Sequence, residues 1–217
     1  MIIPGILEQT FEELKKKIEI VNGMVESIQI DVADNKQVEG ISFLEIERLG
    51  EVKHETPLEI HFMVEKPLDY LPSGEGRIDG VIKVCTQVLD TKDFRDTFVK
   101  IKRLGYLTGV SLNPEEPLSL IEPLIDYIDY IQFMGVIPGK QGNPFIPEVL
   151  EKIKEFKHKH PGILTQLDGG VNDTTLPQIL NSGVDNIVVG SAIFNSEDPK
   201  EKLLELQRTA HGRINNT

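Results

Sequence analysis

Cysteine is almost absent from this sequence of 217 residues, in which Cys85 is the single one. One thiol excludes an internal disulfide and a zinc site built from cysteines alone. Long apolar runs are also missing, since no stretch approaches the roughly 18 apolar residues that a membrane-spanning helix needs. The first residues, MIIPGILEQTFEELKKK, show no basic region followed by a small-residue cleavage site. We therefore expect a cytoplasmic protein without a membrane partner, and Cys85 as a small core residue.

Positive charge is scarce as well. Lysine and arginine number 23 against 35 acidic residues, which gives a formal net charge of −12. A surface of that sign repels the phosphate backbone, so nucleic acid is excluded as the main partner. An anionic small molecule would have to be held locally, by backbone N–H groups or a few placed cations.

What the sequence does contain is one repeating unit, a short β-branched run followed by a polar turn and an amphipathic helical pattern. Eight strands are predicted, at Ile2–Ile6, Ser27–Asp31, Leu58–Met63, Gly80–Cys85, Thr108–Leu112, Tyr130–Met134, Ile163–Asp168 and Asn186–Val189. The clearest helices are predicted at Thr10–Val21, Lys92–Leu104, Pro147–Lys159, Thr175–Ser182 and Lys200–Ala210.

Alternating strands and helices imply a parallel sheet. Eight strands at a spacing of roughly 27 residues favour a closed barrel, because that number and spacing are typical of the TIM fold. The predicted fold class is therefore α/β, a single (β/α)₈ TIM barrel that occupies residues 1–217 as one domain, with the last few residues expected to be disordered. An open doubly wound sheet is the alternative, but it usually has a glycine-rich turn after the first strand, where this chain offers only Gly5.

Polar side chains recur on the inner face of three predicted strands, near their carboxyl ends. Because side chains alternate between the two faces of a strand, the apolar neighbours face the helices and the polar residues face the barrel interior. These inward pairs are Gln29 with Asp31, Glu59 with His61, and Gln166 with Asp168. The carboxyl ends of barrel strands are where TIM-barrel enzymes hold their active sites, so we predict a site there.

Buried carboxylates without partners cost several kcal/mol each. A divalent metal held by Asp31, His61 and Asp168 would remove that cost. Taken one at a time, each aspartate is equally well explained as a helix N-cap, and His61 as a hydrogen-bonded core imidazole. The convergence of all three on one end of the barrel favours the metal site.

Glycines follow the seventh and eighth predicted strands, in the segments DGG and VVGSAIF. TIM barrels commonly bind phosphate in these two loops. Gly169, Gly170, Gly190 and Ser191 would let backbone N–H groups approach phosphate oxygens, with the start of the following short helix beside them. The alternative explanation of these glycines is tight turns.

The motifs extend nearly from end to end: IPGIL, IDVADN, EIHFMVEKP, GVSLNPEEPL, IQFMGVIPGKQGNPFIPEVLEKI, LDGGVN and VVGSAIF. In this order the chain resembles the ribulose-phosphate 3-epimerases, a branch of the ribulose-phosphate-binding barrels. The resemblance implies that Asp31 and Asp168 are an opposed catalytic acid and base and also metal ligands, with His61 as a further ligand. It adds substrate or phosphate contacts at Gly5, Met134, Gly139 and Gly142, beside those already named.

One position departs from the family pattern. Gln29 stands where the family has a metal-binding histidine, and an amide oxygen is a weaker ligand for zinc than imidazole. The expected cofactor is therefore a divalent metal, zinc or, given Gln29, magnesium, manganese or iron. The resemblance also implies a homo-oligomer and a small phosphosugar as the partner.

The leading hypothesis is an isomerase that inverts C3 of a ketose phosphate, either the ribulose 5-phosphate/xylulose 5-phosphate pair or a related hexulose phosphate. Gln29 supports a second hypothesis, a barrel that binds phosphosugars with weakened or lost epimerase activity. A lyase or decarboxylase of the same superfamily is the third hypothesis. Its usual Asp-x-Lys-x-x-Asp motif is not matched by QIDVADNK, where Val32 and Ala33 follow Asp31.

Overall fold

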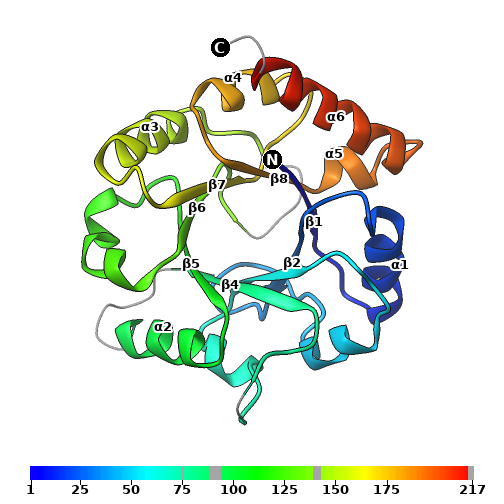
Figure 1. Cartoon of the computed structure of the whole chain (residues 1–217), viewed down its shortest axis with the longest axis vertical. Coiled ribbons are helices and arrows are strands. Elements are labelled where there is room, and N and C mark those ends of the chain that lie inside the picture. Colours follow the sequence, from blue (N-terminus) through cyan, green and yellow to red (C-terminus); the bar gives the residue numbers. More distant parts are fainter. Residues whose placement is uncertain (75, 88–93, 139–142, 215–217) are drawn as a thin grey trace.

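A closed parallel barrel of eight strands forms the centre of the protein, and helices surround it (Figure 1). The computed structural model describes residues 1–74, 76–87, 94–138 and 143–214. The strands are β1 Ile2–Ile6, β2 Ile28–Ala33, β3 Leu58–Met63, β4 Val81–Gln87, β5 Leu107–Leu112, β6 Tyr130–Met134, β7 Leu164–Asp168 and β8 Asn186–Val189. Each strand pairs with the next, and β1 also pairs with β8, which closes the sheet and excludes the open doubly wound alternative.

Helices follow most strands, as the periodicity predicts. The α-helices are α1 Phe11–Val21, α2 Phe94–Arg103, α3 Val149–Lys159, α4 Leu176–Asn181, α5 Ser191–Phe194 and α6 Pro199–Ile214. Short 3₁₀ helices lie in the connections after β2, β3 and β5, at η1 Ile46–Glu51, η2 Pro67–Tyr70, η3 Leu118–Leu120 and η4 Glu122–Tyr127. The predicted (β/α)₈ fold is confirmed.

Helix α1 shows how the sequence sets an element's start and its buried face. Thr10 is the N-cap, and its Oγ1 accepts a hydrogen bond from the backbone N–H of Glu13 at 3.3 Å while donating to the Glu13 carboxylate at 2.7 Å. Such a reciprocal cap stabilises a helix by about 1 kcal/mol. Leu14 and Ile18, four residues apart, share the face that packs against the barrel.

Two strands continue past their predicted carboxyl ends. β2 continues to Ala33 and β4 to Gln87, two residues past the predicted ends. The pairing of Ala33 with Met63, and of Gln87 with Ser111, continues the ladder through these residues. Asp31 therefore projects from within β2 and has one more inward residue between it and the strand's end.

The hydrophobic core lies between the strands and the helices. Outward-facing strand residues such as Ile30, Ile60 and Ile131 are fully buried there. The barrel interior is different, since it contains polar and aromatic side chains. Tyr130 fits inside because its neighbour is Gly109, where an added Cβ would lie 2.3 Å from the tyrosine ring.

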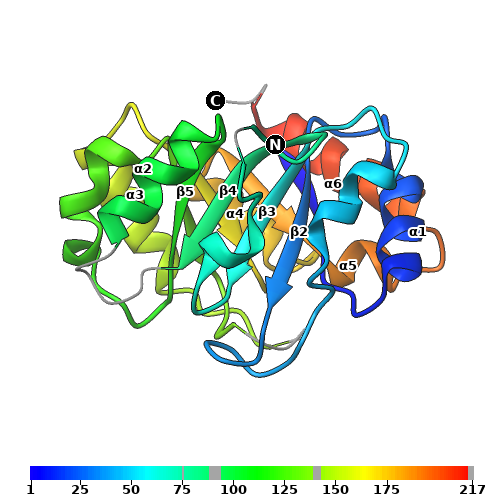
Figure 2. The ribbon, with the colours of Figure 1, turned by 90° about the horizontal axis from the view of Figure 1, so that it is seen from below.

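The two ends of the barrel differ in the side view. The strands' carboxyl ends carry the connections after β2 and β6, whereas the N-terminus lies at the opposite end (Figure 2). Of the predicted inward polar residues, Asp31, His61 and Asp168 lie toward the carboxyl end, and Gln29, Glu59 and Gln166 lie one layer deeper in the barrel. Among the described helices, none combines the length and apolar character that crossing a bilayer requires.

Candidate active site

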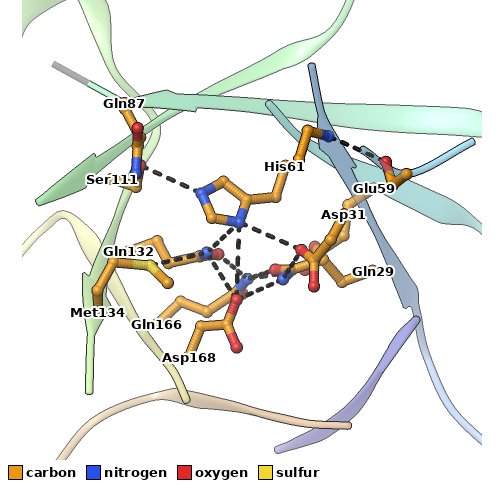
Figure 3. A network of polar contacts seen from close by, with 12 residues as sticks. Gln29, Asp31, Glu59, His61, Gln87, Ser111, Gln132, Met134, Gln166 and Asp168 are labelled. Carbon is orange, nitrogen blue, oxygen red and sulfur yellow. Dashed lines mark hydrogen bonds and ion pairs between the residues drawn. The ribbon is translucent and has the colours of Figure 1, made fainter. Parts of the chain in front are cut away.

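Asp31, His61 and Asp168 meet in the barrel interior near the carboxyl ends of β2, β3 and β7 (Figure 3). Asp31 and His61 are register partners on adjacent strands, and His61 Nδ1 lies 3.2 Å from Asp31 Oδ1. The same nitrogen lies 3.6 Å from Asp168 Oδ2. One ligand atom from each residue falls within 4.8 Å of the others. The predicted convergence of these three side chains is thus present.

One amide connects the carboxylates of Asp31 and Asp168, which we call the acid pair, and a second amide contacts Asp168. Gln29 Nε2 donates to Asp31 Oδ1 at 2.8 Å and to Asp168 Oδ2 at 2.7 Å. Gln132 Nε2 donates to the same Asp168 oxygen at 3.1 Å. N–H donors at this position stabilise two carboxylates that would otherwise repel each other in a buried setting.

Gln132 is a further residue of the site that the sequence motifs did not single out. It is the central residue of YIQFM, on the same face of β6 as Tyr130 and Met134, and it is fully buried. A polar residue on the inward face of a barrel strand was the signal that identified Gln29 and Gln166. Applied to the sixth strand, the same criterion would have found Gln132.

Ser111 was missed as well, and it contacts the far side of the imidazole. Its Oγ lies 3.2 Å from His61 Nε2, and Gln132 Nε2 lies 3.1 Å from His61 Nδ1. When Nε2 carries the proton it donates to Ser111, and the Nδ1 lone pair then faces the acid pair. In that form Nδ1 accepts from Gln132 Nε2. When Nδ1 is protonated it donates to Asp31 instead, and Gln132 keeps its hydrogen bond to Asp168.

The pKa values of Asp168 and His61 differ from those of exposed side chains. Burial raises the pKa of the Asp168 carboxyl to about 7, and the charge of Asp31 acts in the same direction. For His61, burial is the largest influence and lowers the pKa, but the hydrogen bond to Asp31 and the nearby carboxylates outweigh burial, so that its pKa is raised. A carboxyl with a pKa near 7 exchanges its proton under ordinary conditions, which suits an acid or base.

The donor set suits a divalent cation through three side chains. Two carboxylates and one imidazole form a mixed oxygen and nitrogen set that zinc, manganese or iron accepts, and their ligand atoms are already clustered. Gln29, the fourth predicted ligand, turns its Nε2 toward the acid pair, and its Oε1 accepts a hydrogen bond from Gln166 below. In this arrangement Gln29 offers no lone pair to a cation.

A pocket of about 330 Å³ opens above the acid pair. Asp31 and Asp168 line its floor, while Gln29 and His61 lie beneath the surface. Six further predicted contacts line the same pocket: Gly5, Met134, Gly169, Gly170, Gly190 and Ser191. The other two, Gly139 and Gly142, lie outside the described residues. Three asparagines that the sequence analysis did not single out also line it, Asn143, Asn172 and Asn195.

Gly170 has a conformation that other residues avoid. Its φ is +70°, and an added Cβ would lie 2.9 Å from the Cα of Phe145. Gly169, with φ +105°, precedes it. Both glycines line the pocket, and neither has a side chain that would keep a ligand away from the backbone.

A closed parallel barrel with paired acids at the carboxyl ends of its strands and a glycine-lined pocket above them places the protein among the TIM-barrel enzymes. Comparison with known sequences defines the family. The profile of the ribulose-phosphate 3 epimerase family matches residues 1–194. The chain therefore belongs to the ribulose-phosphate 3 epimerase family.

Curated relatives match over almost the whole chain. The ribulose-phosphate 3-epimerase of Bacillus subtilis is 33% identical over 214 residues, covering 95% of this chain and 97% of the relative. The chloroplastic ribulose-5-phosphate-3-epimerase of Arabidopsis thaliana is 30% identical, covering 94% and 74%. Among solved structures, 3-hexulose-6-phosphate synthase from Salmonella typhimurium superposes with a TM-score of 0.71 at 15% identity, covering 97% and 98%. That last likeness supports the fold alone.

Proposed function

We propose that this protein is a phosphosugar epimerase that inverts C3 of a ketose phosphate, with Asp31 and Asp168 as the acid and base. The substrate is ribulose 5-phosphate, with xylulose 5-phosphate as the product, or a related hexulose phosphate. The named relatives act on ribulose phosphate according to their descriptions, and family membership supports the same class of substrate here.

The observation that carries this proposal is the placement of the acid pair in one pocket. Asp31 and Asp168 come from β2 and β7, which are not neighbours in the barrel, and both line the pocket floor. Inversion at a carbon requires a proton to leave one face and another to arrive at the opposite face. Two carboxyls from separate strands supply a base and an acid on different sides of a bound carbon.

The proton balance of the reaction closes within the acid pair. One aspartate takes the proton from C3, and the electron pair left behind is delocalised as an enediolate with the neighbouring carbonyl. The other aspartate then donates its proton to the opposite face of C3. One carboxyl ends protonated and the other ionised, the reverse of the starting state, and exchange with water restores the pair.

The enediolate needs stabilisation near its oxygens. A divalent cation bound by Asp31, His61 and Asp168 would supply positive charge there as a Lewis acid. The chain itself offers Gln29, whose N–H₂ group bridges the two carboxylates, and Gln132, which donates to Asp168. His61, between Ser111 and Asp31, is held in place by hydrogen bonds on both ring nitrogens.

The substrate phosphate would bind at the glycine side of the pocket. Glycine adopts the φ of +70° at position 170 without steric cost, and because it has no side chain the anion can approach its backbone closely. Gly190 and Ser191 line the pocket from the end of β8. A phosphate bound there would position C3 over the acid pair. The binding energy of the phosphate, which does not react, would offset the cost of orienting the reacting carbon.

The deciding experiment is solvent exchange in D₂O. Protein supplied in turn with zinc, magnesium, manganese or iron is incubated with ribulose 5-phosphate, and ¹H NMR follows loss of the C3 proton and growth of xylulose 5-phosphate. We expect deuterium at C3 with wild-type protein and none with Asp31→Asn. Absence of exchange across ribulose 5-phosphate and several hexulose phosphates would contradict the proposal, and release of CO₂ or formaldehyde would reassign the protein to the lyases.

A second candidate is a phosphosugar-binding barrel without turnover. The observation that favours it is the pair of amide donors, Gln29 and Gln132, that already occupy the oxygens of the acid pair. Calorimetric binding of ribulose 5-phosphate, combined with no exchange in D₂O under any metal, would support this candidate over the epimerase.

A further inference from the structure

A second polar layer lies directly below the acid pair, fully inside the barrel. We call it the amide layer, and it consists of Gln29, Glu59, Gln132 and Gln166, from β2, β3, β6 and β7. All four side chains are at most 1% exposed. Buried polar groups of this kind are nearly always hydrogen-bonded. The direction of each hydrogen bond therefore indicates which way each amide group is turned.

Glu59 is the charged end of this layer. Its Oε2 forms an ion pair with Lys83 Nζ at 2.9 Å, and Lys83 also lies 5.6 Å from the centre of the Tyr130 ring. As a carboxylate paired with lysine, Glu59 accepts hydrogen bonds and donates none. Any group that contacts its other oxygen must therefore be a donor.

Gln166 provides that donor, and its orientation follows from its neighbours. Gln166 Nε2 lies 2.7 Å from Glu59 Oε1. The same nitrogen lies 3.1 Å from Gln29 Oε1 and 2.9 Å from Gln132 Oε1. Rotating the Gln166 amide by half a turn would place its oxygen against the Glu59 carboxylate, which can only accept. In the observed orientation the two amide hydrogens serve Glu59 and the amide oxygens of Gln29 and Gln132, while Gln166 Oε1 has no hydrogen-bond partner among the described residues.

Gln29 and Gln132 are held from both ends, by Gln166 below and by the acid pair above. Each turns its Oε1 down to Gln166 Nε2 and its Nε2 up to Asp168 Oδ2. Glu59 thus acts through the Gln166 amide on the amides of Gln29 and Gln132. Along this path each amide accepts from the group below it or donates to the group above it, from the Glu59 carboxylate to the acid pair.

We infer that Glu59 is a positioning residue that, through Gln166, holds the Gln29 amide with its N–H₂ toward the acid pair and its oxygen away from any cation. The inference deepens the proposed function, on which its meaning for catalysis rests, but the orientation itself is independent of substrate. It explains how a glutamine can stand beside a three-ligand site without joining it. It also means that Glu59 limits the affinity of the site for divalent cations.

The test measures cation binding without substrate. Co²⁺ is titrated into wild-type protein and into Glu59→Gln, and its visible absorption and calorimetric heat give the dissociation constant. A glutamine at position 59 can both donate and accept, so Gln166 and Gln29 are free to reverse and Gln29 Oε1 can become a ligand. We expect Co²⁺ to bind about tenfold tighter in the variant, the lower end of what outer-shell partners contribute.

The matched control is the double mutant Gln29→Met/Glu59→Gln compared with Gln29→Met alone. Methionine has no amide, so the substitution at position 59 should leave Co²⁺ affinity unchanged in this background. Thr108→Val is a second control, a buried change in β5 on the helix-facing side of the barrel, and it should also leave the affinity unchanged. Equal tightening with and without Gln29 would overturn the inference, as would unchanged or weaker binding in Glu59→Gln itself.

Glu59→Gln leaves Lys83 without its ion-pair partner, which can prevent folding. The double mutant Glu59→Gln/Lys83→Met removes both charges and carries the same expectation. A neutron structure of the wild-type protein tests the orientation directly, because deuterium marks the amide nitrogen. Deuterium on the Gln29 atom that faces Asp168 supports the inference, and an oxygen there overturns it. Failure of the epimerase assay would contradict the proposed function and leave these results intact.

Discussion

Two aspartates at opposite ends of the barrel, one on β7 and one just before β8, have opposite electrostatic settings. Asp168 ends β7 at the pocket, where burial and the charge of Asp31 raise its pKa to about 7. Asp185 precedes β8 at the other end. Burial would also raise its pKa, but hydrogen bonds from Lys157 and Thr165 outweigh burial and lower it.

The partners explain the difference. Asp185 accepts from Lys157 Nζ at 2.6 Å, from the Thr165 N–H at 2.9 Å and from Thr165 Oγ1 at 2.8 Å. Asp168 accepts from neutral amides and faces a second carboxylate. Its ionisation therefore costs free energy in the folded state, whereas that of Asp185 stabilises the fold. The two ends of the barrel therefore differ: the pocket end contains a buried carboxyl that favours its protonated form, as the proposed function needs, and the other end contains a carboxylate that stabilises the fold.

The largest effect is expected from removing the acidic group at the pocket end, Asp168. Asp168→Asn should lower the rate of C3 exchange by about 10²–10⁴-fold, the range that a positioned acid or base contributes. At pH 8 its free energy of unfolding should be no lower than that of wild type. The reason is that a group whose folded pKa is raised loses stability as pH rises through that pKa. NMR exchange and urea unfolding measure the two quantities, and a stability loss equal to that of a core cavity would contradict the comparison.

The next largest effect is expected from a substitution that adds a metal ligand at the pocket end. Gln29→His should tighten zinc binding by at least the roughly tenfold that even outer-shell partners contribute, because imidazole presents a lone pair where the amide presents N–H. Calorimetry with zinc measures it. Unchanged zinc affinity would show that position 29 does not face the cation site.

The opposite end of the barrel should respond in stability alone. Asp185→Asn should lower the free energy of unfolding at pH 7 by about 1–3 kcal/mol, since it weakens charge-assisted hydrogen bonds, while the rate of C3 exchange should stay at the wild-type value. Because the folded pKa of Asp185 is lowered, its contribution is fully present above the unfolded pKa of about 4. It disappears as pH falls through the lower folded value. Urea unfolding at pH 7 and near pH 3 checks both statements.

The smallest effect is expected from Asp173→Asn, which serves as the control for Asp185→Asn. Asp173 pairs with Lys202 at 2.6 Å, but 65% of its side chain is exposed. Asp173→Asn should change the free energy of unfolding by less than about 1 kcal/mol, as is usual for surface ion pairs. A loss as large as that of Asp185→Asn would mean that the ion pair alone, without burial and backbone donors, accounts for the difference.

Much of the fold could be predicted because its signals are local. Strand and helix positions follow from apolar periodicity, and the predicted helix Thr10–Val21 matches α1 with Thr10 as its cap. The ends of β2 and β4 were placed two residues short, since Ala33 and Gln87 extend their strands through pairing with neighbouring strands. Sequence periodicity contains no record of which strand a residue pairs with.

The site was predicted in part for the same reason. Alternation along β2, β3 and β7 sends Asp31, His61 and Asp168 inward, and closure of the barrel brings them together. Gln29 was expected to turn an oxygen toward a metal. Whether its oxygen or its nitrogen faces the acid pair depends on Gln166 and Glu59, which belong to other strands.

The amino-acid sequence by itself determined the fold class, the inward face of each strand and the family, because periodicity and motifs are properties of neighbours along the chain. The tertiary structure decided which polar atoms meet across the barrel, and with them the raised pKa of Asp168 and the direction of the Gln29 amide. Both depend on distances between side chains from strands far apart in sequence, because a hydrogen bond needs its donor and acceptor within about 3 Å and the energy between two charges falls with their separation.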